Sequence, residues 1–475
     1  MKRLSGVDAM LLYSETAEIH MHTIKVAVVD LSALPAGLPF PELKKAAYRV
    51  LLGLEPLRYR LVSTPGHYHH PMWQENVPID PDYHIRRAVV APPGGRRELD
   101  RLIGALAAVP LERDRPLWEL HIAEGLADNR IAVILKLHHA LADGVASANL
   151  IAKALREYES LLLADTADRP ESIPPVGRLV EGATREHLRQ LANLPSLIWR
   201  TGAGVGRVWR RSRQRRRSHA PRRPALPPPS FANHVVSPGR RFATASLPLS
   251  EAVMVSRKLG VTINDVVLAI AAGALRTLQL RYGGSVDKPL LAGVPASFNK
   301  SPTRLSGNEF GYMIPPLPIH IADPIERVRL TSAAAVVAKE NFALRGPTLM
   351  AEWLAYLPPR FSPAMFRWQS RRLSSGSVMN LTISNVPGPR TTHTLGGARI
   401  SEIHSVGPLA AGSALNITVW SYVDQLNVSV LTDDLTMDDP HEATQAMTDS
   451  FSEIRTAVLA SGNSPGAHLS PAAGD

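Results

Sequence analysis

Apolar positions along the chain follow two periods, and each period predicts one kind of element. Apolar side chains three or four residues apart indicate a helix, and short apolar or alternating runs indicate a strand. In the first 160 residues the pattern predicts helices over Pro41 to Leu52, Arg97 to Ala107 and Asp143 to Tyr158, and strands over Lys25 to Leu31, Trp118 to Ala123 and Ile131 to Leu137.

The same periods return after residue 240. They predict strands over Phe242 to Leu249, Leu290 to Ser297, Val378 to Ser384, Ala414 to Tyr422 and Leu426 to Leu431, and helices over Asn264 to Tyr282, Pro324 to Ala343 and His441 to Leu459. Because strands and helices alternate in both halves, the sequence predicts two α/β domains. A length of 475 residues also suits two domains better than one hydrophobic core.

The segment between the halves differs in composition, because it is rich in proline and arginine. We therefore predict an N-terminal domain over residues 1–165 and a Pro/Arg-rich connection, partly extended and partly helical, over 166–240. A C-terminal domain over 241–460 and a disordered tail over 461–475 would complete the chain.

Positive charge is concentrated in this connection. The formal net charge is +11, and nine arginines with no acidic residue lie between Arg207 and Arg223. Without these nine, 44 of the 53 Lys and Arg residues remain against 42 Asp and Glu, so the rest of the chain is nearly neutral. A broadly basic surface that binds nucleic acid is therefore not indicated.

Three interpretations of this basic segment stay open. Glu186 to Gln214 places leucine and tryptophan among basic residues, which fits a helix docked on the protein with a solvated charged face. The same pattern fits a helix on an anionic membrane or lipid droplet, because anionic headgroups attract arginine. An arginine run can also bind nucleic-acid phosphates without a specific fold. We favour the docked helix and expect no specific nucleic-acid partner.

The composition also narrows the cellular setting. The chain has no cysteine, which excludes disulfides, thiolate metal sites and a cysteine nucleophile, and fits a reducing cytosol. It has no run of about 18 consecutive apolar residues, so we predict no membrane span, and its first residues do not resemble a secretory signal. We expect a soluble cytoplasmic protein, peripheral at the inner membrane or at lipid droplets if the basic segment binds lipid.

Candidate chemistry is concentrated in His138-His139-Ala140-Leu141-Ala142-Asp143-Gly144, between a predicted strand and a predicted helix. A histidine here can take a proton from an alcohol that attacks an ester or thioester carbonyl. Asp143 can start the helix and hold the loop, and Gly144 permits a tight turn. Two buried histidines bonded to backbone groups are the alternative. A metal site is disfavoured because adjacent side chains on a strand point to opposite faces.

This motif resembles the active-site motif of the chloramphenicol acetyltransferase-like CoA-dependent acyltransferases, which is shared with condensation domains of peptide synthetases. Further segments resemble, in the same order, the bacterial wax ester synthase/diacylglycerol acyltransferase family. They are Leu4 to Leu12 with Met21-His22, Pro110 to Glu119, Thr262 to Ala269, Gly307 to Phe310 and Ser384 to Pro389.

The resemblance implies two chloramphenicol acetyltransferase-like domains around a central tunnel. It implies transfer of a long-chain acyl group from acyl-CoA to the hydroxyl of diacylglycerol or of a long-chain alcohol, with no cofactor and no metal. His139 would be the general base, His138 would pack behind it, and Asp143 would orient the loop.

The resemblance also points to four residues of the second half. Asn264 and Asp265 would line the tunnel, or only cap the helix that they begin. Ser384 and Asn385 would offer donors near the developing oxyanion, or only shape the turn before the following Val-Pro-Gly-Pro.

Two other kinds of protein would share the histidine motif. One is a condensation-type acyltransferase that uses another acceptor or a carrier-bound donor, and the other is a catalytically weak homologue that binds lipid or membrane. Serine-hydrolase and nucleotide-hydrolase chemistry has no motif here, because the sequence contains no Gly-x-Ser-x-Gly elbow and no phosphate loop.

Overall fold

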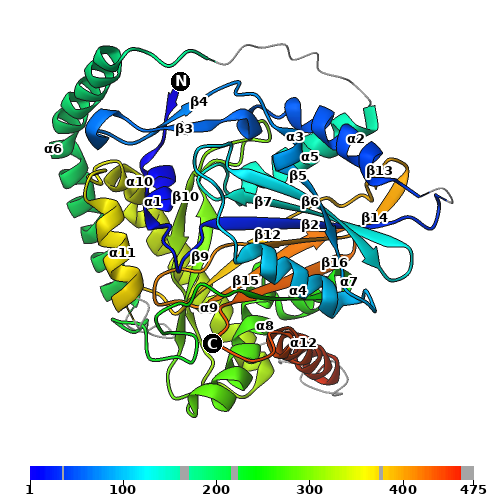
Figure 1. The fold of residues 1–475 in the computed structure, drawn as a ribbon. Coiled ribbons are helices and arrows are strands. Elements are labelled where there is room, and N and C mark those ends of the chain that lie inside the picture. Colours follow the sequence, from blue (N-terminus) through cyan, green and yellow to red (C-terminus); the bar gives the residue numbers. More distant parts are fainter. Residues whose placement is uncertain (35–36, 161–170, 216–222, 374–377, 462–475) are drawn as a thin grey trace.

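The computed structural model of the chain describes all residues except 35–36, 161–170, 216–222, 374–377 and 462–475 (Figure 1). The disordered tail predicted over 461–475 lies, beyond Ser461, outside the described residues.

A six-stranded mixed sheet organises the first half, in the order β13-β14-β2-β7-β6-β5 (Figure 1). Its strands are β2 (His22–Asp30), β5 (Ile85–Val89), β6 (Trp118–Leu126), β7 (Arg130–His138), β13 (Thr394–Leu395) and β14 (Ala398–Val406). The three strands predicted in this half are confirmed as β2, β6 and β7. β2 and β7 run antiparallel, with Lys25 opposite Leu135.

Two strands of this first sheet come from the second half of the chain. β14 pairs with β2 along most of its length, and β13 forms a short hairpin with β14. The sequence analysis did not find β14, because a bulge between Ile400 and Glu402 breaks its two-residue alternation. The strand also buries polar side chains, among them His404 and Ser405.

Helices cover both faces of the first sheet. α2 (Phe40–Leu52) and α5 (Gly144–Ser160) lie over the face from which Leu135 projects. α4 (Arg96–Ala107) lies over the other face, where Nζ of Lys136 donates to the carbonyls of Leu106 and Val109. All three helices occupy the positions that the apolar periodicity predicts.

The second half is built on a seven-stranded sheet, in the order β10-β9-β12-β15-β16-β8 with β11 paired to β9. The strands are β8 (Arg241–Pro248), β9 (Leu290–Ser297), β10 (Phe310–Met313), β11 (Pro316–Leu317), β12 (Leu381–Val386), β15 (Leu415–Tyr422) and β16 (Gln425–Thr432). Four helices accompany it: α7 (Leu249–Leu259), α8 (Ile263–Leu278), α9 (Pro324–Arg345) and α12 (His441–Ser461). All five strands and three helices predicted here are confirmed with small changes at their ends.

Among the described residues, one segment, Ile263–Gly283, is long and apolar enough to cross a membrane. It comprises α8 and one following turn, and 72% of its most apolar window is buried inside the protein. α8 lies against α9 and α12, so its apolar side chains are buried in the core of the second half.

The connection between the halves contains α6 (Val176–Gln214), a 39-residue helix with Pro195 inside it. It includes the helix predicted over Glu186 to Gln214 and begins ten residues earlier. α6 packs along α9 and α10 (Leu349–Leu354), and α1 (Gly6–Ser14) and α11 (Ser362–Arg372) lie on the same side of the molecule (Figure 1). A small sheet of β1 (Lys2–Arg3), β4 (Met72–Gln74) and β3 (Arg60–Val62), and the short helix α3 (Pro81–His84), complete the fold.

Candidate active site

His138 and His139 lie where β7 ends, and they project to opposite sides of the first sheet. The N–H of His139 donates to the carbonyl of Met21 at 2.7 Å, which extends the ladder between β2 and β7 by one residue. Because side chains alternate along a strand, His139 shares a face with Leu135 and Lys25, and His138 lies on the face that α4 covers. The fold therefore separates the two histidines.

A buried amide fixes the tautomer of His139. Nδ2 of Asn308 donates to the carboxylate of Asp8 and to the carbonyl of His139, both at 2.7 Å. Its Oδ1 therefore faces Nδ1 of His139, at 3.0 Å, as an acceptor. Nδ1 of His139 must then carry the proton, and Nε2 keeps a lone pair that can accept one.

His139 is held as a neutral base by its surroundings. Burial lowers its pKa below the ordinary value, and the nearby charge of Lys25 also lowers it. A hydrogen bond with its own backbone, the charge of Asp143 and the hydrogen bond to Asn308 raise the pKa but do not cancel the effect of burial. The ring of Phe310 lies 5.9 Å from the imidazole, centroid to centroid. His139 is therefore mainly neutral at pH 7.

His138 is buried on the opposite face of the sheet, with 1% of its surface exposed. Its Nδ1 accepts the N–H of Ala140 at 3.0 Å, so Nε2 carries the proton and faces Oε1 of Glu15 at 3.7 Å. Arg113 holds that carboxylate from the other side at 2.6 Å. Burial lowers the pKa of His138 to about 3, which keeps the ring neutral.

Asp143 is tied to a segment of the second half that we call the clasp, Arg304 to Phe310. Nη2 of Arg304 lies 2.8 Å from both carboxylate oxygens of Asp143, and the N–H groups of Ala146 and Glu309 donate to the same carboxylate at 2.9 and 3.0 Å. Both partners of the ion pair are buried, with side-chain exposures of 4% for Asp143 and 8% for Arg304. The carboxylate is thus fully occupied in joining the motif loop to the clasp.

Backbone contacts continue this connection. The N–H of Gly307 donates to the carbonyl of Leu141 at 2.7 Å, and the N–H of Asp143 donates to the carbonyl of Gly307 at 3.2 Å. Gly307 adopts φ = +80°, a conformation that residues with a Cβ rarely adopt. This turn lays the clasp alongside the motif loop and brings Asn308 to His139.

Asn264 and Asp265 begin α8, as the sequence indicates, but they have different surroundings. Asp265 is buried and forms a capping box with Thr262, and it also accepts the hydroxyl of Ser332 at 3.0 Å. Oδ1 of Asn264 lies 3.4 Å from Nδ2 of Asn385, at the long end of the hydrogen-bond range.

β12 carries Ser384 and Asn385 toward the motif. A Cβ placed on Gly144 would lie 3.3 Å from a methyl group of Val386, so the end of β12 lies against the start of α5. Ser384 lies in the parallel ladder with β15, opposite Thr418. Among the described contacts, none joins Asn264, Asp265, Ser384 or Asn385 directly to His139.

Within the part of the chain that the structure describes, no group of three or more His, Asp or Glu side chains is arranged to hold a metal ion. His139 provides a neutral imidazole between the two halves of the chain, and its Nε2 has no hydrogen-bond partner among the described residues.

Comparison with known proteins assigns this arrangement to a family. The model of the wax ester synthase/diacylglycerol acyltransferase catalytic domain matches residues 4–267, and that of the family's C-terminal domain matches residues 306–455. The chain belongs to the wax ester synthase/diacylglycerol acyltransferase family. It is 51% identical over 460 residues to a candidate diacylglycerol O-acyltransferase of Mycobacterium tuberculosis, covering 96% of this chain and 97% of the relative. It is 32% identical over 375 residues to the O-acyltransferase WSD of Acinetobacter baylyi, covering 76% and 78%.

Solved structures show the same fold. The wax ester synthase/diacylglycerol acyltransferase from Marinobacter aquaeolei VT8 matches with a TM-score of 0.65 and 24% identity, over 97% of this chain and all of that one. The first condensation domain of the calcium-dependent antibiotic synthetase matches with a TM-score of 0.59 and 16% identity, over 96% of each chain. The expected pair of chloramphenicol acetyltransferase-like domains is confirmed, and this family member is an acyltransferase.

Several residues around His139 were missed by sequence reasoning. Asn308 and Asp8 lie inside segments that carry the family resemblance, but the sequence does not indicate that they contact each other. Arg304 lies just before the Gly307 to Phe310 segment and gave no signal. Long-range pairs of this kind, such as Asn308 with Asp8, become visible only when the fold brings them together.

We expect Asn308→Ala to slow acyl transfer about 10- to 100-fold, because an unanchored His139 can rotate or change tautomer, and small misplacements of a reacting group have effects of this size. The loss should fall on kcat, with little change in KM for acyl-CoA, in steady-state assays. Asn299→Ala, in the loop before the clasp and bonded to Ser301 rather than to His139, is the matched control. Equal losses in the two variants would contradict the positioning role.

We expect Asp143→Asn to lower the free energy of unfolding by roughly 3–5 kcal/mol, because it leaves Arg304 buried without its counter-charge. Urea denaturation measures this change. Asp128→Asn removes the carboxylate of an exposed pair with Arg130 and should cost less than about 1 kcal/mol. An Asp143→Asn protein that is as stable as the wild type, or that loses a limb of its pH–rate profile, would argue against a role confined to holding the loop.

Proposed function

We propose that this acyltransferase moves a long-chain acyl group from acyl-CoA to the hydroxyl of diacylglycerol, and of long-chain alcohols, with His139 as the general base. The observation that carries the proposal is the fixed tautomer of His139, whose Nδ1 donates to Asn308 and whose Nε2 is free. The names of the relatives, diacylglycerol O-acyltransferase and wax ester synthase, support both classes of acceptor.

On this proposal Nε2 of His139 takes the proton of the alcohol as its oxygen attacks the thioester carbonyl. The tetrahedral intermediate then collapses, the carbon–sulfur bond breaks, and the CoA thiolate receives the proton from the imidazolium. No metal and no cofactor is required, and the imidazole returns to its starting state. Asp143 takes no part in the proton transfer, because its carboxylate is occupied by Arg304 and two backbone N–H groups.

Asn264 and Asn385 are proposed to line the substrate side of the site. They lie beside each other where α8 begins and β12 ends, and Val386 brings that end of β12 against Gly144. Their 3.4 Å contact is weak enough for the Asn385 amide to turn toward an oxyanion. Asp265 is assigned to capping α8, and Ser384 to the end of the strand.

We expect His139→Ala to lower acyl transfer at least about 100-fold, the usual contribution of a positioned base. Labelled palmitoyl-CoA is incubated with dioleoylglycerol or hexadecanol, and neutral-lipid products are separated. In the wild type, kcat/KM should fall on the acid side with a midpoint below about 6.5, the ordinary value for histidine, because burial lowers the pKa of His139. Circular dichroism establishes that the variant is folded. A folded His139→Ala protein with near-wild-type turnover would refute the mechanism.

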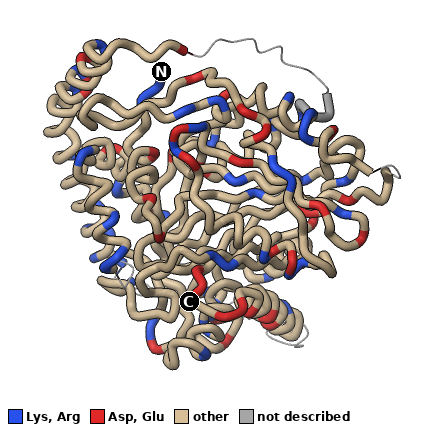
Figure 2. The backbone as a smooth tube through the Cα atoms, viewed as in Figure 1, with Lys and Arg blue, Asp and Glu red and all other residues tan. Residues whose placement is uncertain are grey.

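Peripheral contact with an anionic membrane or lipid droplet is proposed for the outer side of α6. Figure 2 shows basic residues along this helix. Part of the arginine cluster is used inside the protein, because Arg211 and Arg215 pair with Glu340 and Arg207 donates to the carbonyl of Leu344. Arg216, Arg217 and Arg222 lie outside the described residues.

The rest of α6 offers the features of an interfacial helix. Arg213 stacks on the ring of Trp209 at 3.6 Å, and Arg210 is exposed nearby. Exposed apolar side chains follow the helix at spacings of three, four and seven residues: Leu188, Leu191, Ile198, Val205 and Trp209, with Trp199 beside them. Apolar side chains next to arginine suit the headgroup region of anionic lipid. We propose a cytoplasmic enzyme that works at such a surface, where its water-insoluble products can leave.

We expect Arg210→Gln with Arg213→Gln to weaken binding to phosphatidylglycerol vesicles about 30-fold at low salt, since each arginine contributes about 1 kcal/mol near an anionic surface. Flotation assays measure the binding, which should fall steeply as salt is raised. Arg185→Gln with Arg189→Gln removes the same charge from helix-internal ion pairs at the other end of α6 and is the control. Absence of wild-type binding, or equal losses in both double variants, would leave the cluster as a solvated connection.

A further inference from the structure

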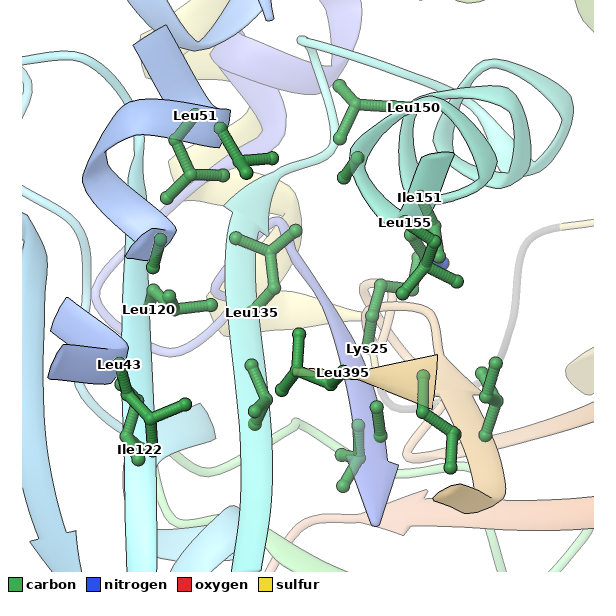
Figure 3. Close-up of a pocket in the computed structure, with 18 residues that line it drawn as sticks. Lys25, Leu43, Leu51, Leu120, Ile122, Leu135, Leu150, Ile151, Leu155 and Leu395 are labelled. Carbon is green, nitrogen blue, oxygen red and sulfur yellow. The ribbon is translucent and has the colours of Figure 1, made fainter. Parts of the chain in front are cut away.

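An apolar cavity lies between the first sheet and the helices α2 and α5 (Figure 3). Its empty volume is about 920 Å³, including the space at its open mouth. Leu120, Ile122, Val133 and Leu135 form its floor, and Leu51 and Leu155 are among the helix residues above them. The enclosed part of the cavity is about 140 Å³, several times the roughly 10–15 Å³ that one water needs in this measure, so part of a long alkyl chain has room here.

One residue in this wall is not apolar. Of the described residues that line the cavity, Lys25 alone is charged, and it is only 6% exposed. Its Nζ donates to Oγ of Ser405 at 2.6 Å and lies 5.3 Å from the ring centroid of Trp420. An ammonium group has three donors, and Ser405 is its single hydrogen-bond partner among the described residues. Apart from its contact with the Trp420 ring, this buried cation therefore has N–H donors that no described hydrogen bond uses.

Lys25 lies at the end of the cavity that is nearer to the reacting centre. It pairs with Leu135, four residues before His139 on the same strand, and the two-residue alternation puts all three side chains on one face. Four residues span roughly 13 Å along a strand. The charge of Lys25 influences the pKa of His139, which places the two groups within electrostatic reach.

We propose that this cavity receives one acyl chain of the acceptor, and that Lys25 selects acceptors carrying an ester carbonyl on the carbon next to the reacting hydroxyl. This inference rests on the proposed function, because it concerns the alcohol that His139 deprotonates. In a 1,2-diacylglycerol the free hydroxyl and an ester group occupy neighbouring carbons. The hydroxyl can then approach His139 while the ester carbonyl accepts a hydrogen bond from Lys25 and its chain enters the cavity.

A plain long-chain alcohol cannot make this contact. Its hydrocarbon would pass a buried cation whose remaining donors stay unmatched, and an unmatched buried donor is costly. Burial already lowers the pKa of Lys25 to about 8, a sign that the apolar surroundings oppose its charge. Lys25 is thus the residue that makes the enzyme prefer diacylglycerol over simple alcohols.

The test compares two acceptors and two lysines. We expect Lys25→Met to lower the ratio of kcat/KM for 1,2-dioctanoylglycerol to that for hexadecanol by about 10- to 100-fold, the range for one hydrogen bond to a charged group. Lys25→Gln, which keeps N–H donors, should restore part of the ratio. Lys45→Met, on the exposed side of α2, should leave it unchanged. If Lys25 only stabilises the fold, both acceptors lose equally, and that result overturns the proposal.

A second pair of variants tests the cavity itself. Ala47 lines it and its neighbour Ala46 does not, although both lie half-buried on α2. Ala47→Phe should shift the preference from dioleoylglycerol toward dioctanoylglycerol several-fold, and Ala46→Phe should not. Equal chain-length profiles in the two variants would place the acceptor chain elsewhere. The same comparison with octanoyl- and palmitoyl-CoA distinguishes an acceptor chain from a donor chain, since a shift in the donor profile alone would overturn the assignment.

A binding measurement separates this inference from the proposed function. Equilibrium dialysis with labelled 1,2-dioctanoylglycerol and no acyl-CoA requires no turnover. We expect wild-type binding to weaken at least about 10-fold in Lys25→Met. If that loss is seen but no acyl transfer to any alcohol occurs, the proposed function fails and the binding site stands. If transfer occurs but Lys25→Met binds dioctanoylglycerol as the wild type does, the proposed function stands and the role of Lys25 is refuted.

Discussion

The buried ion pair between Asp143 and Arg304 is the contact on which the geometry of the site depends. Asp143 ends the loop that carries His139, and Arg304 begins the clasp that carries Asn308. Removing two charges from water costs free energy. The hydrogen bonds that the carboxylate accepts from the backbone N–H groups of Ala146 and Glu309 offset part of that cost. His139 and the Asn308 amide that orients it therefore keep their positions only when both halves of the chain are assembled.

The two-residue alternation of β7 gives the adjacent residues His138 and His139 different surroundings. The alternation of β7 sends His138 toward the buried carboxylate of Glu15 and sends His139 toward the face covered by α2 and α5. Burial lowers the pKa of both rings, but His138 is buried whereas His139 is partly exposed on the face that carries the cavity. A one-residue shift in the pairing of β7 would exchange the two environments. His138 rather than His139 would then lie on the face covered by α2 and α5.

Local patterns predict this fold well where periodicity is regular and poorly where it is not. The strands and helices flanking the histidine motif follow from apolar spacing, and the motif itself follows from residue types at a strand–helix junction. β14 was not predicted, because its bulge and its buried polar residues break the alternation of apolar and polar positions. The residues that hold His139 were missed for another reason. Asn308 lies 169 residues from His139 in the sequence, its partner Asp8 lies 300 residues from Asn308, and Arg304 lies 161 residues from Asp143, so no local spacing indicates these contacts.

Lys25 is another residue that breaks the local pattern of apolar positions. It interrupts the apolar run from Ile24 to Val29 in β2. Burying its charge among leucine and isoleucine side chains costs free energy that hydrophobic packing would not. The serine hydroxyl and the tryptophan ring beside it recover only part of that cost. Local patterns tend to be broken where function requires it. In this chain the break lies on the face of the sheet that carries His139, the proposed base, and this shared face is what supports our proposal that an acceptor oxygen matches the remaining donors of Lys25.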